Sequence, residues 1–203
     1  LEIPVALDGI VVVVNKQNPV KSLTLEQLRK IYRGEITDWK DLGGAPGAIV
    51  TYGRENSSGT YAYFKEHVLK EQDFSPRTQT LAGTAAIINA VSKDANGIGY
   101  SGHGYSEGVK MLALAAEEGA EAVEPDEAHV ASGAYPLSRP LFFYVDQAKY
   151  TDMVADFVNY CLSPEGQAIV METGYFPVQK KEKADGSASA EATPAATPEK
   201  RPE

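Results

Sequence analysis

The residues whose types and spacing most clearly suit ligand binding are Arg54, Ser58, Gly59 and Thr60. They lie in the stretch Arg54-Glu55-Asn56-Ser57-Ser58-Gly59-Thr60. A turn with hydroxyl residues and a glycine at the start of a helix directs free backbone N–H groups and the positive end of the helix dipole at one point. An arginine just before this turn adds a planar set of donors that matches two oxygens of a phosphate or carboxylate. Together these residue types predict a binding site for an oxyanion.

The segments around this stretch are predicted to place it at a helix start. Residues 49–52 form a short apolar run typical of a strand, and apolar residues at 61, 64, 68 and 69 follow the spacing of one helical face. The same pattern also suits an ordinary helix cap, because Ser or Thr at a helix start stabilises the helix by about 1 kcal/mol without binding any ligand. The pattern by itself leaves both interpretations open.

The composition is that of an acidic chain of globular type. Its 203 residues are 43% hydrophobic and 23% charged, and the formal net charge is −9. This charge argues against nucleic acid and anionic membranes as partners, although a local group of donors can still bind an anion. No run of 18 apolar residues occurs, which predicts no membrane span, and no signal peptide is visible. Cys161 falls in an apolar helical pattern and is predicted to be a packed thiol rather than a reactive one.

The first two thirds of the chain alternate predicted strands and helices. Residues 10–14 form a continuous β-branched run, typical of a strand buried on both faces in a mostly parallel sheet. Thr24 and Gln27 have the spacing of a capping box and start a helix that Gly34 ends, and Trp39 after it is predicted to be a core residue. The remaining predicted elements of this part are a helix at 84–92, a strand at 98–100, a strand at 109–116 and a short helix ending near 132.

The last third of the chain adds a strand, two helices and a polar tail. A second long apolar strand is predicted at 137–145, and helices are predicted at 149–162 and 163–173. Residues 180–203 have almost no apolar residues beyond alanine and are predicted to be disordered. The alternation of strands and helices, without an internal repeat, predicts an α/β fold with a mostly parallel sheet flanked by helices. Ligands of such sheets bind at the carboxyl ends of strands, where the loop 54–60 is expected to lie.

Five separate motifs together resemble the phosphate-binding proteins of Pst-type bacterial ABC importers, over about residues 3–178. They occur in the order that the family has, which makes the resemblance specific. The motifs are Asp8–Asn15, Leu23–Trp39, Arg54–Thr60, Gly97–Tyr100 and Tyr135–Leu141. The resemblance implies a type II periplasmic-binding-protein fold, in which two α/β lobes joined by crossing strands close on a dehydrated phosphate.

The resemblance also implies a site and partners. In the family, an arginine and a Ser-Gly-Thr four residues later hold phosphate oxygens through guanidinium, hydroxyl and backbone N–H donors. Carried over, the phosphate-binding residues are Arg54, Ser58, Gly59 and Thr60. The implied partners are inorganic phosphate and the membrane subunits of an ABC importer. The implied location is the periplasm or another extracytoplasmic site, with lipid anchoring of a precursor as one arrangement. No cofactor, metal, catalytic residue or nucleic acid is expected.

The expected division of the chain has four parts. Residues 1–14 are a hinge strand and a remnant of lobe one, 15–136 are lobe two with the anion loop, 137–178 return to lobe one, and 179–203 are a disordered tail. The family begins with a further segment that completes lobe one and supplies an aspartate, which accepts a hydrogen bond from protonated phosphate and so disfavours sulfate. This segment is missing here, and Asp8, beside the hinge strand, is not expected to replace that aspartate. Weak phosphate binding is therefore expected, because water reaches a half-open site.

Two other classes of function are weighed against this one. An enzyme acting on phosphate esters would use Ser58 as a nucleophile and would need a base held by a third group. The histidines His67, His103 and His129 lie in no motif, and His67 is more than two helical turns beyond Ser58, so no enzyme is expected. No metal-ligand spacing occurs. The alternatives are a scaffold, sensor or adhesion module that has lost its ligand, or a binder of another tetrahedral oxyanion.

Overall fold

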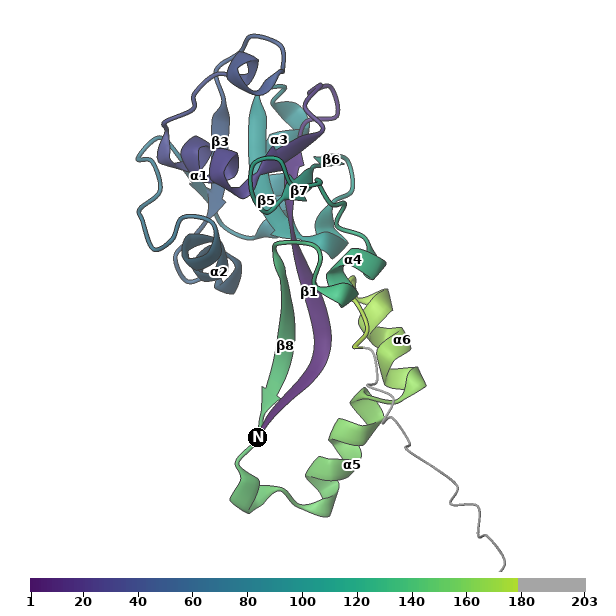
Figure 1. Ribbon diagram of the computed structural model, residues 1–203. Coiled ribbons are helices and arrows are strands. Elements are labelled where there is room, and N and C mark those ends of the chain that lie inside the picture. Colours follow the sequence, from purple (N-terminus) through teal and green to yellow (C-terminus); the bar gives the residue numbers. More distant parts are fainter. Residues whose placement is uncertain (179–203) are drawn as a thin grey trace, which may run out of the picture.

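Strand β1 (Glu2–Val14) connects the two parts of the molecule. In the computed structural model, which describes residues 1–178, the second half of β1 lies inside a layered body and its first half leaves that body in a two-stranded ribbon (Figure 1). Every residue from Ile10 to Val14 is fully buried, so the predicted buried strand is confirmed, although the strand already begins at Glu2. We call residues 10–137 the body, and residues 1–9 together with 138–178 the stem.

The body is built on a mixed sheet with the strand order β4, β3, β5, β1, β6. The bounds are Val50–Arg54 for β3, Gln79–Leu81 for β4, Gly97–Gly102 for β5 and Lys110–Met111 for β6. Strand β3 is parallel to β4 and β5, because a helix crosses between each consecutive pair of these strands. Strand β1 is antiparallel to β5, β6 and β8 (Ser138–Tyr144). The α/β class is confirmed, and the parallel pairs of this sheet lie in its β4–β3–β5 part.

The predicted strand at 109–116 is divided into two strands with different partners. Strand β6 joins β1 in the main sheet, whereas β7 (Ala113–Ala115) pairs in parallel with β2 (Ser22–Thr24) in a separate two-stranded sheet. The buried Leu112 lies between them. The predicted strand at 137–145 agrees with β8, and the predicted disordered tail at 179–203 lies outside the described residues.

The helices agree with the predicted starts in most cases. Helix α1 begins with the predicted capping box, in which Thr24 Oγ1 accepts from the Gln27 N–H at 3.0 Å and Gln27 Oε1 accepts from the Thr24 N–H at 2.9 Å. None of the helices within residues 1–178 is long and apolar enough to cross a membrane. The α-helices are α1 (Leu25–Arg33), α2 (Gly59–His67), α3 (Thr84–Lys93), α4 (Glu127–Ser132), α5 (Asp152–Cys161) and α6 (Pro164–Glu172), and the 3-10 turns are η1 (Trp39–Leu42), η2 (His103–Tyr105) and η3 (Gln147–Lys149).

Aromatic side chains fill the centre of the body. Tyr32 from α1, Phe64 from α2 and Tyr100 from β5 are fully buried, and the Phe64 ring centroid lies 4.9 Å from that of Tyr32 and 4.0 Å from that of Tyr100. Trp39 is also buried, and its Nε1–H donates to the Asn96 carbonyl at 3.0 Å, so its predicted place in the core is confirmed. The contacts of Phe64 fix α2, and with it the loop 54–60, against the sheet.

The stem has far fewer buried side chains than the body. Figure 1 shows β1 and β8 leaving the body as a ribbon, with α5 and α6 beside it. The predicted helix at 149–162 is confirmed as α5, although it begins only at Asp152, and its apolar residues Met153 and Phe157 are 81% and 58% exposed. The physical reason is that no further layer within residues 1–178 covers this side of α5. Cys161, predicted to be packed, is only partly buried.

Candidate anion-binding site

The loop 54–60 has the predicted strand–turn–helix geometry. Strand β3 ends at Arg54, and α2 begins at Gly59 with Ser58 as its N-cap. The Ser58 Oγ accepts from the Tyr61 N–H at 3.3 Å, and only 8% of Ser58 is exposed. Ser58 therefore has the role of an ordinary cap, which leaves the first-turn N–H groups of Gly59 and Thr60 without partners inside the helix.

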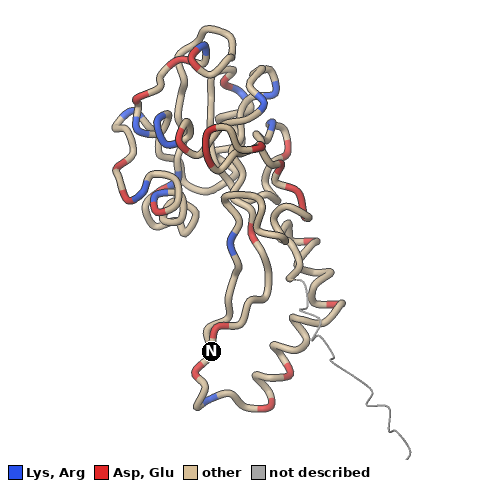
Figure 2. Tube along the Cα trace, viewed as in Figure 1, with Lys and Arg blue, Asp and Glu red and all other residues tan. Residues whose placement is uncertain are grey.

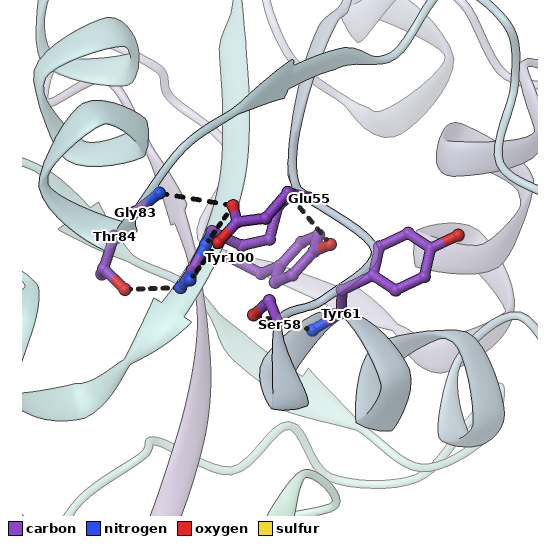
Figure 3. A network of polar contacts seen from close by, with 7 residues as sticks. Glu55, Ser58, Tyr61, Gly83, Thr84 and Tyr100 are labelled. Carbon is purple, nitrogen blue, oxygen red and sulfur yellow. Dashed lines mark hydrogen bonds and ion pairs between the residues drawn. The ribbon is translucent and has the colours of Figure 1, made fainter.

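The Arg54 side chain is held by three hydrogen bonds to two residues, Glu55 and Thr84, both labelled in Figure 3. Its Nε and one terminal nitrogen donate to the two carboxylate oxygens of Glu55 at 3.1 and 3.0 Å, and its other terminal nitrogen donates to Thr84 Oγ1 at 2.8 Å. The edge of the guanidinium formed by Nε and one terminal nitrogen, which could bind two oxygens of an anion, is thus occupied by Glu55. One N–H on each terminal nitrogen is left for a ligand, so Arg54 offers an oriented pair of donors.

Glu55 is the acidic partner that sequence reasoning missed. The Arg54 guanidinium, the Glu55 N–H and the Gly83 N–H, which donates at 3.3 Å, lower the pKa of Glu55 to about 2. The carboxylate therefore stays ionised and cancels much of the Arg54 charge at neutral pH. Behind Arg54, burial raises the pKa of Tyr100 to about 12, so its hydroxyl remains protonated where it accepts from the Arg54 N–H at 3.2 Å (Figure 3).

A cavity of about 220 Å³ lies where the end of β3 meets the stem. Arg54 and Thr60 line it, whereas Ser58 and Gly59 are not among its lining residues. The four residues predicted from the sequence are therefore neighbours, but only two of them face the cavity. The lining residues are Asp8, Arg54, Thr60, Thr84, Gly102, His103, Gly104, Tyr105, Arg139, Thr173, Gly174 and Tyr175.

Two charged residues of the stem reach this cavity without having been predicted there. Asp8 is 4% exposed, and its Oδ2 accepts from Arg139 Nε at 3.1 Å and from a terminal nitrogen of Arg139 at 2.9 Å. Asp8 was set aside as a residue beside the hinge, and Arg139 was part of a motif with no assigned role. A buried charge needs a partner, so an Asp directly before an apolar strand was the available signal.

The three histidines have different surroundings. His67 stacks on Tyr63 with ring centroids 3.9 Å apart, and its Nδ1 lies 3.1 Å from the Tyr63 carbonyl. His129 pairs with Asp126 at 2.9 Å, away from the anion loop in sequence. His103 lines the cavity, and burial lowers its pKa, so it is neutral at pH 7. Within residues 1–178, no group of three or more His, Cys, Asp or Glu side chains is arranged to hold a metal ion.

A comparison with models of protein families identifies the superfamily of this chain. The model described as the PBP superfamily domain matches residues 1–165. The chain belongs to the PBP superfamily. Relatives found by sequence include proteins named phosphate-binding protein PstS. The phosphate-binding protein PstS of Pseudomonas aeruginosa is 41% identical over 195 residues, which cover 88% of this chain and 60% of the relative. PstS of Staphylococcus epidermidis is 36% identical over 189 residues, which cover 89% and 57% of the two chains.

Solved structures of the PBP superfamily agree with this assignment. A putative phosphate ABC transporter substrate-binding protein from Clostridium perfringens, solved with bound phosphate, is 35% identical with a TM-score of 0.76, and the match covers 88% of this chain and 72% of that one. An ABC-type phosphate transport receptor from Vibrio cholerae is 30% identical with a TM-score of 0.74, covering 87% and 72%. The chain therefore spans about 60% of the length of its curated relatives and just over 70% of these solved chains.

Proposed function

We propose that this chain is the phosphate-binding lobe, with part of a second lobe, of a receptor that binds inorganic phosphate for an ABC importer without changing it chemically. The observation that carries the proposal is the meeting of Arg54 and Thr60, at the start of α2, on one cavity at the carboxyl end of β3. An oxyanion in this cavity would accept from the free N–H groups of Arg54 and from the first turn of α2.

The size and lining of the cavity fit a small anion. Its volume of about 220 Å³ is well above the roughly 10–15 Å³ that one water needs on the same measure, so it has room for a tetrahedral anion. A larger hollow of about 540 Å³ lies beside α1, but it is lined by Glu26, Asp41, Glu117 and Glu118 as well as by cations. That acidic lining disfavours an anion there.

The proposed role is binding and not catalysis. Ser58 is engaged as the N-cap of α2, and His67 stacks on Tyr63. Nucleophilic serine requires a base within hydrogen-bond reach of its hydroxyl, and among residues 1–178 no hydrogen bond joins Ser58 to a histidine or carboxylate.

The two-lobe division is part of the proposal. Residues 15–136 would form lobe two, and residues 1–14 and 137–178 would form the hinge strands and a part of lobe one. Two observations support it: β1 and β8 leave the body together as paired strands, and α5 exposes an apolar stripe on which further polypeptide would pack (Figure 1). By this division the site closes only when lobe one is complete, so the chain alone binds phosphate weakly. The site would work outside the cytoplasm and deliver phosphate to the importer's membrane subunits.

Isothermal titration with phosphate tests the proposal, with Arg54→Ala and Thr60→Val as site variants. Arg33→Ala is the matched control, because Arg33 also pairs with a glutamate, Glu35, but belongs to α1 away from the cavity. We expect weak binding that Arg54→Ala abolishes and Arg33→Ala preserves. A parallel titration with sulfate tests whether this half of the site distinguishes phosphate from another tetrahedral anion.

Two outcomes of this titration would count against the proposal. Binding of phosphate that survives Arg54→Ala would place the ligand elsewhere on the chain. Absence of any phosphate binding at millimolar concentration would favour a module of this fold that has lost its ligand.

A further inference from the structure

A second arginine reaches the anion cavity from the stem. The described residues of the stem contain two basic side chains, Arg139 and Lys149, and Figure 2 shows how few Lys and Arg residues lie there compared with the body. Arg139, from β8, lines the same cavity as Arg54 and Thr60. Because the stem has so few basic residues, the presence of Arg139 at this cavity is not explained by a generally basic stem.

The Arg139 guanidinium contacts the first turns of α2. One terminal nitrogen donates to the Gly59 carbonyl at 3.3 Å, and the guanidinium carbon lies 5.0 Å from the centroid of the Tyr63 ring. The Tyr63 hydroxyl in turn donates to the Ser138 carbonyl, next to Arg139, at 3.0 Å. Strand β8 and the first turns of α2 are thus joined at three points around a single side chain.

The same guanidinium neutralises Asp8 on β1. Asp8 is almost fully buried, and both hydrogen bonds that its carboxylate accepts within residues 1–178 come from Arg139. Without Arg139, an unpaired carboxylate would lie in the wall of a cavity that is proposed to hold an anion. A like charge at this position would repel the ligand and would itself be costly to bury.

We propose that Arg139 is a positioning residue for the anion loop: it fixes the first turn of α2 on the β1–β8 ribbon and cancels the charge of Asp8 in the cavity wall. This inference rests on the proposed function, because it concerns the same site. Arg54 and the N–H groups of α2 contact the anion, whereas Arg139 acts through Gly59, Tyr63 and Asp8. A planar fork with several donors suits this role, and a lysine would make only some of the contacts.

The test compares three variants with a matched control. Arg139→Gln removes the charge and the fork, Arg139→Lys keeps the charge, and the double variant Asp8→Asn with Arg139→Gln removes both charges together. Arg33→Gln is the control, since it removes an arginine paired with Glu35 on α1. Phosphate affinity is measured from NMR shifts of the Gly59 and Thr60 amides, and thermal unfolding is measured without ligand.

We expect Arg139→Gln to weaken phosphate binding about 100-fold and Arg139→Lys about tenfold. We expect the double variant to regain thermal stability, because no buried charge is left unpaired, but to bind phosphate as poorly as Arg139→Gln. A double variant that binds like the wild type would overturn the positioning role, because removal of the Asp8 charge would then be sufficient. Wild-type affinity in Arg139→Gln would also overturn it.

Hydrogen exchange of the ligand-free protein separates this inference from the proposed function. The Tyr61 and Ala62 amides, which donate to Ser58, report on the first turn of α2. Should the wild type show no Arg54-dependent phosphate binding, the proposed function fails, and the positioning role is then decided by exchange alone. Faster exchange of these amides in Arg139→Gln and unchanged exchange in Arg33→Gln would support it, and equal exchange in both variants would overturn it.

Discussion

The body and the stem use similar apolar residues with opposite results. In the body, Tyr32, Phe64 and Tyr100 are fully buried between helices and sheet, whereas in the stem Met153 and Phe157 are more than half exposed. A helix stripe is buried only when another layer lies opposite it. The body supplies its own opposing layers, while in the described residues of the stem this side of α5 faces no opposing layer. The cavity lined by Arg54 and Thr60 lies where these two parts meet, so one wall comes from the body and another from the stem.

The largest expected difference between the two parts is the cost of removing a buried ring. Phe64→Ala should lower the free energy of unfolding by about 3–5 kcal/mol, because it leaves a cavity among Tyr32 and Tyr100. Phe157→Ala, at a 58% exposed position, should change it by less than about 1 kcal/mol. Urea denaturation followed by circular dichroism measures both values. Equal costs would show that α5 is covered in solution, and the contrast between body and stem would be lost.

The junction between the parts is expected to be nearly as sensitive. Gly174 has φ +84°, and a Cβ there would lie 2.6 Å from the Cα of Gly104 in η2. Gly174→Ala should therefore cost about 2–4 kcal/mol, from backbone strain and from overpacking. Gly133→Ala is the control, because Gly133 has φ +75° but open space around it, and it should cost only about 1 kcal/mol. A cost no greater than that of the control would mean that the C-terminal turn does not pack on η2.

Helix caps give a smaller contrast. Thr24→Ala removes the hydroxyl that accepts from the Gln27 N–H in the α1 capping box, while the backbone N–H of residue 24 can still donate to Gln27, and it should cost about 1 kcal/mol. Thr151 precedes α5 but makes no capping hydrogen bond with its side chain, so Thr151→Ala should change the free energy of unfolding by only a few tenths of a kcal/mol. Thermal denaturation of the two variants side by side measures the difference. A larger effect of Thr151→Ala would indicate a cap that forms in solution.

The smallest expected effect is a pH dependence from His103. Burial lowers its pKa below the ordinary value of 6.5, so the unfolded chain takes up a proton at a higher pH than the folded chain does. The free energy of unfolding should therefore fall as the pH drops through 6.5 towards the folded pKa, and His103 should contribute no slope above that range. His103→Gln should flatten this part of the profile, which urea denaturation over a series of pH values measures. An unchanged slope in His103→Gln would assign the pH dependence to another group.

Local features of the molecule were predictable because short-range hydrogen bonding decides them. The capping box of Thr24 and Gln27, and the strand–turn–helix around Ser58, depend on residues within a few positions of each other. The buried run from Ile10 to Val14 was equally readable, since β-branched apolar side chains gain most from burial on both faces of a sheet. The roles of Arg54, Ser58, Gly59 and Thr60 as phosphate ligands stay a prediction.

Other features depend on contacts between distant parts of the chain. Asp8 and Arg139 are separated by 131 positions, and only the pairing of β1 with β8 brings them together at the cavity. The orientation of Arg54 depends on Thr84 as well as on its neighbour Glu55. The outward direction of the α5 stripe is likewise set by which layers surround it. The sequence alone thus determined the strand–turn–helix geometry of residues 54–60, because its hydrogen bonds are local. The tertiary structure decided the charges around the cavity, because burial and pairing are properties of the whole fold.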